Sequence, residues 1–129
     1  MSSPVPRSGL HILCVDDDAV IAQLLHEVLQ AEGHDVAVAV DGQDALDQII
    51  VQKRVFDLLI TDVAMPRVTG PELIAALLLG GFTSPVIVFS ASFADGDREA
   101  LHGLGVTHII HKPNVRELAS TVRHFTTVA

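Results

Sequence analysis

Short apolar segments alternate with longer segments of helical periodicity along almost the whole chain. The apolar segments are rich in Val, Ile and Leu, which is typical of strands that are buried on both faces. They lie at residues 10–15, 35–40, 56–61, 85–89 and 106–110. The segments between them repeat apolar residues every three or four positions, as one face of a helix does. This alternation predicts a parallel sheet that is covered by helices on both faces.

Five helices are expected, one after each strand. They are predicted over residues 19–31, after Asp41-Gly42, between Gly70 and Gly80, around residues 95–103 and from residue 115 to 125. Their inward faces are predicted to include Leu24, Ile50 and Leu78. Right-handed strand–helix–strand units of this kind build an α/β, doubly wound, five-stranded (βα)₅ sheet. The flavodoxin-like strand order 2-1-3-4-5 is predicted.

The length of 129 residues is enough for one domain. We assign residues 10–127 to this domain and residues 1–9, which hold two prolines and three serines, to a flexible tail. The longest apolar run, residues 73–82, is far shorter than the roughly 20 residues that a membrane-spanning helix needs. We therefore expect no membrane span.

Acidic residues outnumber basic ones by 16 to 8, which gives a formal net charge of −8. This charge disfavours binding to nucleic-acid phosphates or anionic lipids, so no direct contact with nucleic acid is expected. The only cysteine, Cys14, has no partner for an internal disulfide and lies within an apolar strand. A reducing, cytoplasmic location and an unreactive buried thiol are predicted.

Polar residues follow four of the predicted strands. Asp16, Asp17 and Asp18 come after the first strand, Asp62 after the third, Ser90 after the fourth and Lys112 after the fifth. In an open parallel sheet the functional crevice lies beyond the carboxyl ends of the strands, where the strand order reverses. The first and third strands are neighbours at that point, so their acidic residues are expected to converge.

Two carboxylates 4 Å apart repel each other by about 4 kcal/mol at an effective dielectric constant near 20, so a cation is expected between them. Oxygen ligands of this kind favour Mg²⁺ before Ca²⁺. A carboxylate beside the metal can act as a nucleophile towards phosphorus. Lys112 and Ser90 would then supply a cation and a hydroxyl donor to the phosphoryl oxygens. The residues therefore predict a site for a metal-bound phosphoryl group.

Four motifs in this order resemble those of the response-regulator receiver domains of two-component signalling, in particular the single-domain, chemotaxis-type members. They are residues 12–17 (ILCVDD), 60–66 (ITDVAMP) with Gly70, 88–91 (VFSA) and 111–113 (HKP). The resemblance spans residues 10 to about 125. It implies a phosphoacceptor switch rather than an enzyme.

By this resemblance, Asp62 receives a phosphoryl group from a phosphohistidine on a sensor histidine kinase or a histidine phosphotransfer protein. Ser90 then donates a hydrogen bond to a phosphoryl oxygen and Lys112 pairs with the group. The Lys112–Pro113 bond is expected to be cis. The surface of the fourth helix, fifth strand and fifth helix would bind a downstream partner or output domain, or form a homodimer.

The resemblance also implies the ligands of a Mg²⁺ ion. Asp17, Asp62 and the backbone carbonyl of Ala64 would hold the metal, and Asp16 would act mainly through a metal-bound water. These positions are the predicted metal site.

Two positions depart from the family pattern. Ile109 stands where receivers usually carry Tyr or Phe, three residues before the lysine, so an inward rotation of a ring is not available to report phosphorylation. Ala64 and Ser92, two residues beyond Asp62 and Ser90, lack the amide or carboxylate groups that can border the path of an attacking water. We expect a changed output coupling and a changed lifetime of the acyl phosphate.

Two alternatives stay open at this point. The pattern Asp16-x-Asp18-x-Val20 after a strand also fits a haloacid-dehalogenase-type phosphohydrolase in which Asp16 is the nucleophile. The other alternative is a binding module that keeps the receiver fold and is never phosphorylated. Asp18 itself is left open between capping a helix and a place in the site. His108 and His111 are interpreted as structural or solvated, because their spacing along a strand points them to opposite faces.

Overall fold

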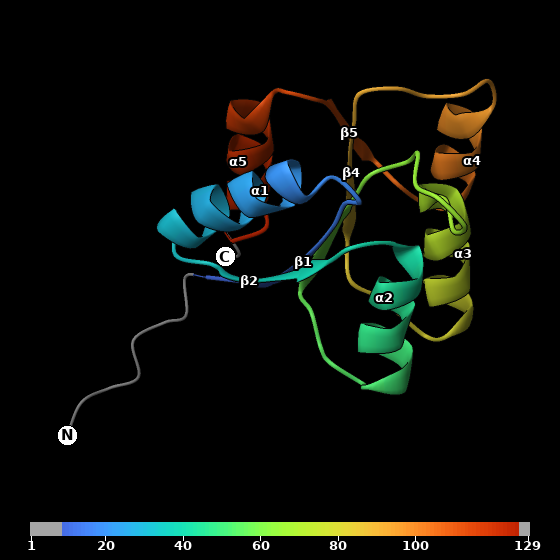
Figure 1. The fold of residues 1–129 in the computed structure, drawn as a ribbon, viewed down its shortest axis with the longest axis horizontal. Helices are drawn as coiled ribbons and strands as arrows, with labels where there is room; N and C mark the ends of the chain where they lie inside the picture. The colour runs from blue at the N-terminus through green and yellow to red at the C-terminus, as the bar shows by residue number, and fades with distance from the viewer. Residues whose placement is uncertain (1–8, 127–129) are drawn as a thin grey trace.

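A five-stranded parallel sheet forms the centre of the molecule (Figure 1). The computed structural model describes residues 9–126. The strand order is β2-β1-β3-β4-β5, which confirms the predicted order. The strands are β1 (His11–Val15), β2 (Asp35–Ala39), β3 (Leu58–Thr61), β4 (Val86–Ser90) and β5 (His108–His111).

The helices cover both faces of the sheet. They are α1 (Ala19–Ala31), α2 (Gly42–Leu46), α3 (Gly70–Leu79), α4 (Asp97–Gly103) and α5 (Val115–His124). A π-helical turn, η1 (Asp47–Val51), continues α2. In Figure 1, α1 and α5 lie together on one side of the sheet, and α2, α3 and α4 lie on the other.

Alternate residues of each strand point to opposite faces, so the core has two sides. In β1, Ile12 and Cys14 belong to a cluster with residues of α1 and α5. Leu13 and Val15 belong to a second cluster, which residues of α2 and α3 complete. The strand β1 is therefore buried on both faces, which explains its almost wholly apolar sequence.

Some predicted boundaries and buried positions are wrong. The strand β3 begins at Leu58 rather than at residue 56, and β5 is shifted towards the carboxyl end by one or two residues. Leu24, Ile50 and Leu78 were expected to face the sheet but are 39%, 40% and 45% exposed. Successive helical residues are rotated by about 100°, so a side chain next to the buried stripe already lies at its edge. In η1 the wider turn buries Gln48 in place of Ile50.

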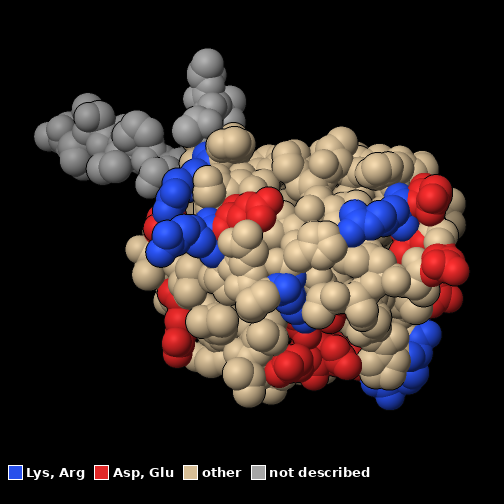
Figure 2. Space-filling view, turned by 90° about the horizontal axis from the view of Figure 1, so that it is seen from above, with Lys and Arg blue, Asp and Glu red and all other residues tan. Residues whose placement is uncertain are grey.

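The predicted flexible tail, residues 1–9, lies outside the described residues except for Gly9, and so does residue 127 at the end of the predicted domain. Within residues 9–126, none of the helices has both the length and the apolar character that crossing a membrane requires. On the face seen in Figure 2, the basic side chains form small separate groups with acidic groups among them, and they do not join into one basic surface.

Candidate functional site

The polar residues predicted from the strand ends meet at the carboxyl edge of the sheet. Asp62 and Lys112 each follow a strand and keep a backbone hydrogen bond to the neighbouring strand: Asp62 N–H donates to the Val15 carbonyl (3.1 Å) and Lys112 N–H to the Ser90 carbonyl (3.0 Å). The backbone at these positions is therefore fixed by the sheet. This arrangement holds their side chains close to Asp16, which follows β1.

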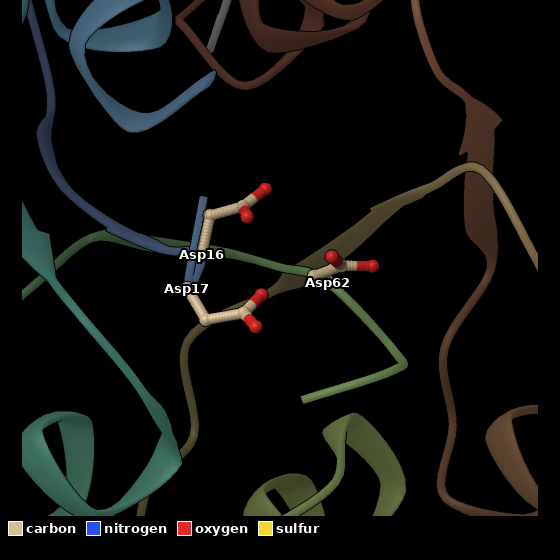
Figure 3. A group of neighbouring side chains, drawn as sticks. All are labelled: Asp16, Asp17 and Asp62. Atoms are coloured by element: carbon tan, nitrogen blue, oxygen red, sulfur yellow. The ribbon is translucent and has the colours of Figure 1, made fainter. Parts of the chain in front are cut away.

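Three carboxylates form an acidic cluster at this edge (Figure 3). Asp16, Asp17 and Asp62 each offer an oxygen, and these oxygens lie within 4.8 Å of one another. Asp16 and Asp62 are only 3% and 8% exposed, whereas Asp17 is exposed to solvent. The predicted convergence of acids from β1 and β3 is confirmed.

Both oxygens of Asp62 have hydrogen-bond donors. Oδ1 accepts from the backbone N–H of Val63 (2.7 Å) and from the Ser90 hydroxyl (2.5 Å), and Oδ2 accepts from Lys112 Nζ (3.0 Å). The Ser90 hydroxyl also lies 3.1 Å from the carbonyl oxygen of Ser92. Its single proton serves one of these acceptors at a time. Asp62 is thus held in one orientation by three different residues.

Lys112 lies between two of the carboxylates. Its Nζ is 2.7 Å from Asp16 Oδ2 and 3.0 Å from Asp62 Oδ2. Burial lowers the pKa of Lys112, but its hydrogen bonds to the two carboxylates outweigh this effect and raise the pKa above its usual value. Burial raises the pKa of Asp16, while Lys112 acts in the opposite direction. The ammonium group therefore stays charged at neutral pH and offsets part of the repulsion within the cluster.

Asp18 is the N-cap of α1. Its Oδ1 accepts hydrogen bonds from the backbone N–H groups of Val20 (2.9 Å) and Ile21 (3.4 Å). Its own N–H donates to Asp16 Oδ1 (2.9 Å). Asp18 is therefore a helix cap, which answers the question that the sequence left open. Its carboxylate is engaged by the first N–H groups of α1 and does not serve as a second catalytic acid beside Asp16.

Ala64 and Ser92 are exposed and border a hollow of about 400 Å³ next to the site. The side chain of Phe93 also lines this hollow. Ile109 is half-buried and packs with Phe93 against a small cluster that includes Val88. The Lys112–Pro113 bond is cis, as the resemblance implied.

The remaining interpretations of single residues agree with the structure. Cys14 is fully buried, and burial followed by the charge of Asp16 raises the pKa of its thiol to about 12, so the thiol is inert. His108 contacts Phe125 and His111 contacts Phe93, on opposite sides of β5.

Two further contacts were not predicted from the sequence. The first is an ion pair between Arg67, in the β3–α3 connection, and Asp41, which caps α2 by accepting from Asp44 N–H (2.8 Å). The backbone hydrogen bond from Asp44 and the Arg67 guanidinium hold the pKa of Asp41 below its usual value. The second is a stack of Phe93, Arg98 and His111. The sequence indicates that Asp41 can cap a helix, but it does not indicate that Arg67 pairs with Asp41.

The donor set fits a hard divalent cation. Carboxylate oxygens are the preferred protein ligands of Mg²⁺ and Ca²⁺, and Mg²⁺ usually takes only one or two carboxylates and keeps several waters. The exposed Asp17 leaves one side of the cluster open to water and to an incoming group. Asp16, Asp17 and Asp62 can therefore hold a metal ion.

The family profile of the response regulator receiver domain matches residues 12–123, which include every residue of the acidic cluster. The chain belongs to this receiver domain family. As a receiver domain it is a phosphoacceptor of two-component signalling and not a catalytic enzyme, and its acidic pocket serves phosphorylation-driven signalling. Receiver domains pair with histidine kinases.

Curated relatives of this receiver domain include the transcriptional regulatory protein CpxR of Escherichia coli K12, which is 41% identical over 113 residues. That match covers 87% of this chain and 47% of CpxR. The response regulator receiver protein Anae109_2439 of Anaeromyxobacter is 37% identical over 101 residues, covering 78% of this chain and 42% of that protein. The receiver domain thus spans about half the length of the curated relatives that it matches.

Solved receiver structures agree with the fold. The chemotaxis protein CheY4 of Vibrio cholerae is 30% identical with a TM-score of 0.80, covering 91% of this chain and 98% of that chain. The response regulator TrrA of Thermotoga maritima, solved in complex with Mg²⁺-BeF, is 29% identical with a TM-score of 0.76, covering 89% of this chain and 97% of that chain. The hydrolase alternative is set aside, because the chain is a receiver domain and Asp18 is a helix cap.

Proposed function

We propose that Asp62 is the phosphoacceptor and that it receives its phosphoryl group from a phosphohistidine of a sensor histidine kinase or a histidine phosphotransfer protein. The observation that carries this proposal is that Asp62 alone among the three carboxylates is bound by both Ser90 and Lys112. A hydroxyl donor and an ammonium group are what a transferred phosphoryl group needs around its oxygens. Asp16 shares Lys112, but Ser90 is bonded to Asp62.

The lone pairs of Asp62 indicate which oxygen reacts. Oδ1 already accepts two hydrogen bonds, whereas Oδ2 accepts one, from Lys112. A carboxylate oxygen has two lone pairs, so Oδ2 keeps one for attack on phosphorus. The new O–P bond forms as the P–N bond of the donor breaks, and the bonding electron pair leaves with the donor imidazole, whose other nitrogen carries the proton. The products are an acyl phosphate on Asp62 and a neutral histidine.

Mg²⁺ is the cofactor that we propose, held by Asp16, Asp17, Asp62 and the backbone carbonyl of Ala64. When bound, it would neutralise negative charge on the phosphoryl oxygens. The Ser90 hydroxyl can turn from Asp62 Oδ1 to the Ser92 carbonyl, which frees a lone pair on Oδ1 for a cation. Lys112 then turns towards a phosphoryl oxygen without leaving the acidic cluster.

The donor protein has to bring its histidine to Asp62, so we propose that it docks beside the acidic cluster. Val20, Leu24 and Val40 are 76%, 39% and 62% exposed. Asp16, Asp17 and Val40 line one shared hollow of about 250 Å³. Large exposed apolar patches mark protein-binding surfaces, and we propose that these side chains form part of one. A partner seated there would cover the site from the α1 side.

The output side is proposed to be the surface of α4, β5 and α5, which would bind a downstream partner, an output domain or a second copy of the chain. We propose a cytoplasmic setting, because the single cysteine, Cys14, suits a reducing compartment. We also propose no direct contact with nucleic acid, since the net charge is −8.

The test is to incubate the protein with Mg²⁺ and acetyl phosphate and to locate the phosphate by mass spectrometry. We expect label on Asp62, no label in Asp62→Asn, and no label without a divalent cation. Asp16→Asn separates the alternatives, because label that remains on Asp62 in this variant excludes Asp16 as the nucleophile. Label on Asp16 in the wild-type protein would overturn the proposal, and no label on any residue would leave a receiver-like binding module.

A further inference from the structure

Three side chains form a stack that joins the β4–α4 connection, α4 and the end of β5. Phe93 comes from the β4–α4 connection, Arg98 from the first turn of α4, and His111 is the last residue of β5. The guanidinium carbon of Arg98 lies 4.4 Å from the centre of the Phe93 ring, and the His111 ring meets the Phe93 ring edge-on at 5.4 Å and 64°. Arg98 Nη2 donates to His111 Nε2 (2.9 Å), since a guanidinium has no acceptor. Each of the three residues therefore contacts the other two.

Two members of the stack are tied closely along the chain to the residues that hold Asp62. Phe93 follows Ser90 by three residues, and His111 directly precedes Lys112. The two segments are also joined by the hydrogen bond from Lys112 N–H to the Ser90 carbonyl (3.0 Å). A change in the position of either Ser90 or Lys112 is therefore passed to the stack over a short length of backbone.

The third member belongs to a weakly held helix. α4 has seven residues, and Leu101 is its only buried one. Its N-cap, Gly96, makes no side-chain hydrogen bond to the helix. The contacts of Arg98 with Phe93 and His111 therefore add to the hydrogen bond from Ala94 N–H to Asp97 Oδ2 (2.6 Å) in fixing the first turn of α4.

We propose that Phe93, Arg98 and His111 are positioning residues that couple phosphorylation of Asp62 to the position of α4. This inference rests on the proposed function of Asp62. Ile109 lies on the same apolar cluster as Phe93, but its aliphatic side chain has no ring or polar atom with which to bind α4. In the stack, Phe93 supplies the ring and His111 supplies the polar acceptor atom that bind Arg98 of α4.

The coupling works through the loss and remaking of hydrogen bonds at Asp62. When Ser90 and Lys112 turn from the carboxylate to a phosphoryl oxygen, Phe93 and His111 shift with them. Arg98 follows because it binds both rings, and α4 follows Arg98. The hollow of about 400 Å³ that Phe93 lines gives the β4–α4 connection room to move.

The experiment is hydrogen–deuterium exchange of the α4 amides, with and without Mg²⁺ and beryllofluoride, a mimic of the phosphoryl group. In the wild-type protein we expect the mimic to change α4 exchange by about fivefold or more, the lower range of a typical coupling between two sites. In Phe93→Leu and Arg98→Gln this change should fall below about twofold. Labelling of Asp62 by acetyl phosphate should stay at the wild-type level in both variants.

Phe93→Tyr keeps the ring and should restore the α4 response, which a general loss of packing does not predict. Arg116→Gln removes an exposed arginine from α5 and is the matched charge control. An unchanged α4 response in Phe93→Leu and Arg98→Gln, or no α4 response in a labelled wild-type protein, would overturn the coupling. Loss of labelling in these variants would assign the stack to the site itself and also overturn it. Failure of the wild-type protein to label would instead overturn the proposed function.

Discussion

Two helices that follow strands of the acidic site, α1 after β1 and α4 after β4, are held very differently. The helix α1 has 13 residues, is capped by Asp18 and buries Ala22, Leu25 and Leu29. The helix α4 has seven residues, lacks a side-chain cap and buries Leu101 alone. A firmly held helix such as α1 keeps the carboxylates in place for a metal ion and a phosphoryl group. A weakly held helix such as α4 can change position at low energetic cost. The difference supports our proposal that a signal leaves through α4 rather than through α1.

The largest expected effect is on the stability that the packing of α1 provides. Leu29→Ala removes a fully buried side chain from α1 and should lower the free energy of unfolding by about 2–5 kcal/mol, measured by urea denaturation. Leu24→Ala, at a position on the same helix that is 39% exposed, is the control and should cost less than about 1 kcal/mol. Equal losses in the two variants would contradict the packing of α1 described above.

A smaller effect is expected from the cap of α1. Asp18→Ala leaves the first N–H groups of the helix without their acceptor and should cost about 1 kcal/mol of stability. Asp18→Asn keeps an acceptor oxygen and should retain most of that stability. If Asp18→Ala is as stable as the wild-type protein in thermal denaturation, Asp18 is not a cap.

A substitution in α4 should have only a local effect. Ala100→Gly, at an exposed position in α4, should cost at most about 1 kcal/mol. Hydrogen exchange should become faster in α4 and stay unchanged in α1. A comparable increase in the exchange rates of both helices would show that α1 and α4 unfold together, which would remove the contrast between them.

The smallest effect is a pH dependence on the α1 side. His34 is buried just after α1, and its Nδ1 accepts a hydrogen bond from Leu10 N–H (3.0 Å). Burial lowers the pKa of His34 below 6.5 in the folded protein. The unfolded chain therefore takes up the proton first, so this contribution to stability is complete above about pH 6.5 and is lost as the pH falls below it.

Denaturation between about pH 7 and pH 5 measures the contribution of His34. The loss of stability over this range should be smaller in His34→Gln than in the wild-type protein. His102→Gln, which replaces an exposed histidine of α4, is the control. A variant His34→Gln that loses as much stability as the wild-type protein would contradict the assignment.

Local signals explain what the sequence could predict. The bounds of α1 were predicted at residues 19–31 and found there, because Asp18 caps the start and Gly33, with a φ of 97°, ends the helix. The site residues Asp16, Asp62, Ser90 and Lys112 were predicted because the carboxyl ends of parallel strands share one edge. Both kinds of signal are readable without knowing how the loops fold.

The rest depends on tertiary contacts. The sequence did not indicate η1, because the hydrophobic pattern of Ile49 and Ile50 fits an α-helix equally well. Phe93 and Arg98 lie in a connection and a polar helix with no periodic pattern, so their stack with His111 appears only once β4 and β5 are paired. The same holds for the pair of Asp41 and Arg67.

The most direct test of the central claim is calorimetric titration of the protein with Mg²⁺, in the wild type and in Asp17→Asn. Asp17 is exposed, so this variant should fold normally and lose only a ligand. We predict one binding site per chain in the wild-type protein and an affinity at least about tenfold lower in Asp17→Asn. No detectable uptake of Mg²⁺, or equal affinity in the two proteins, would contradict the claim that these carboxylates form the metal site of a phosphoacceptor.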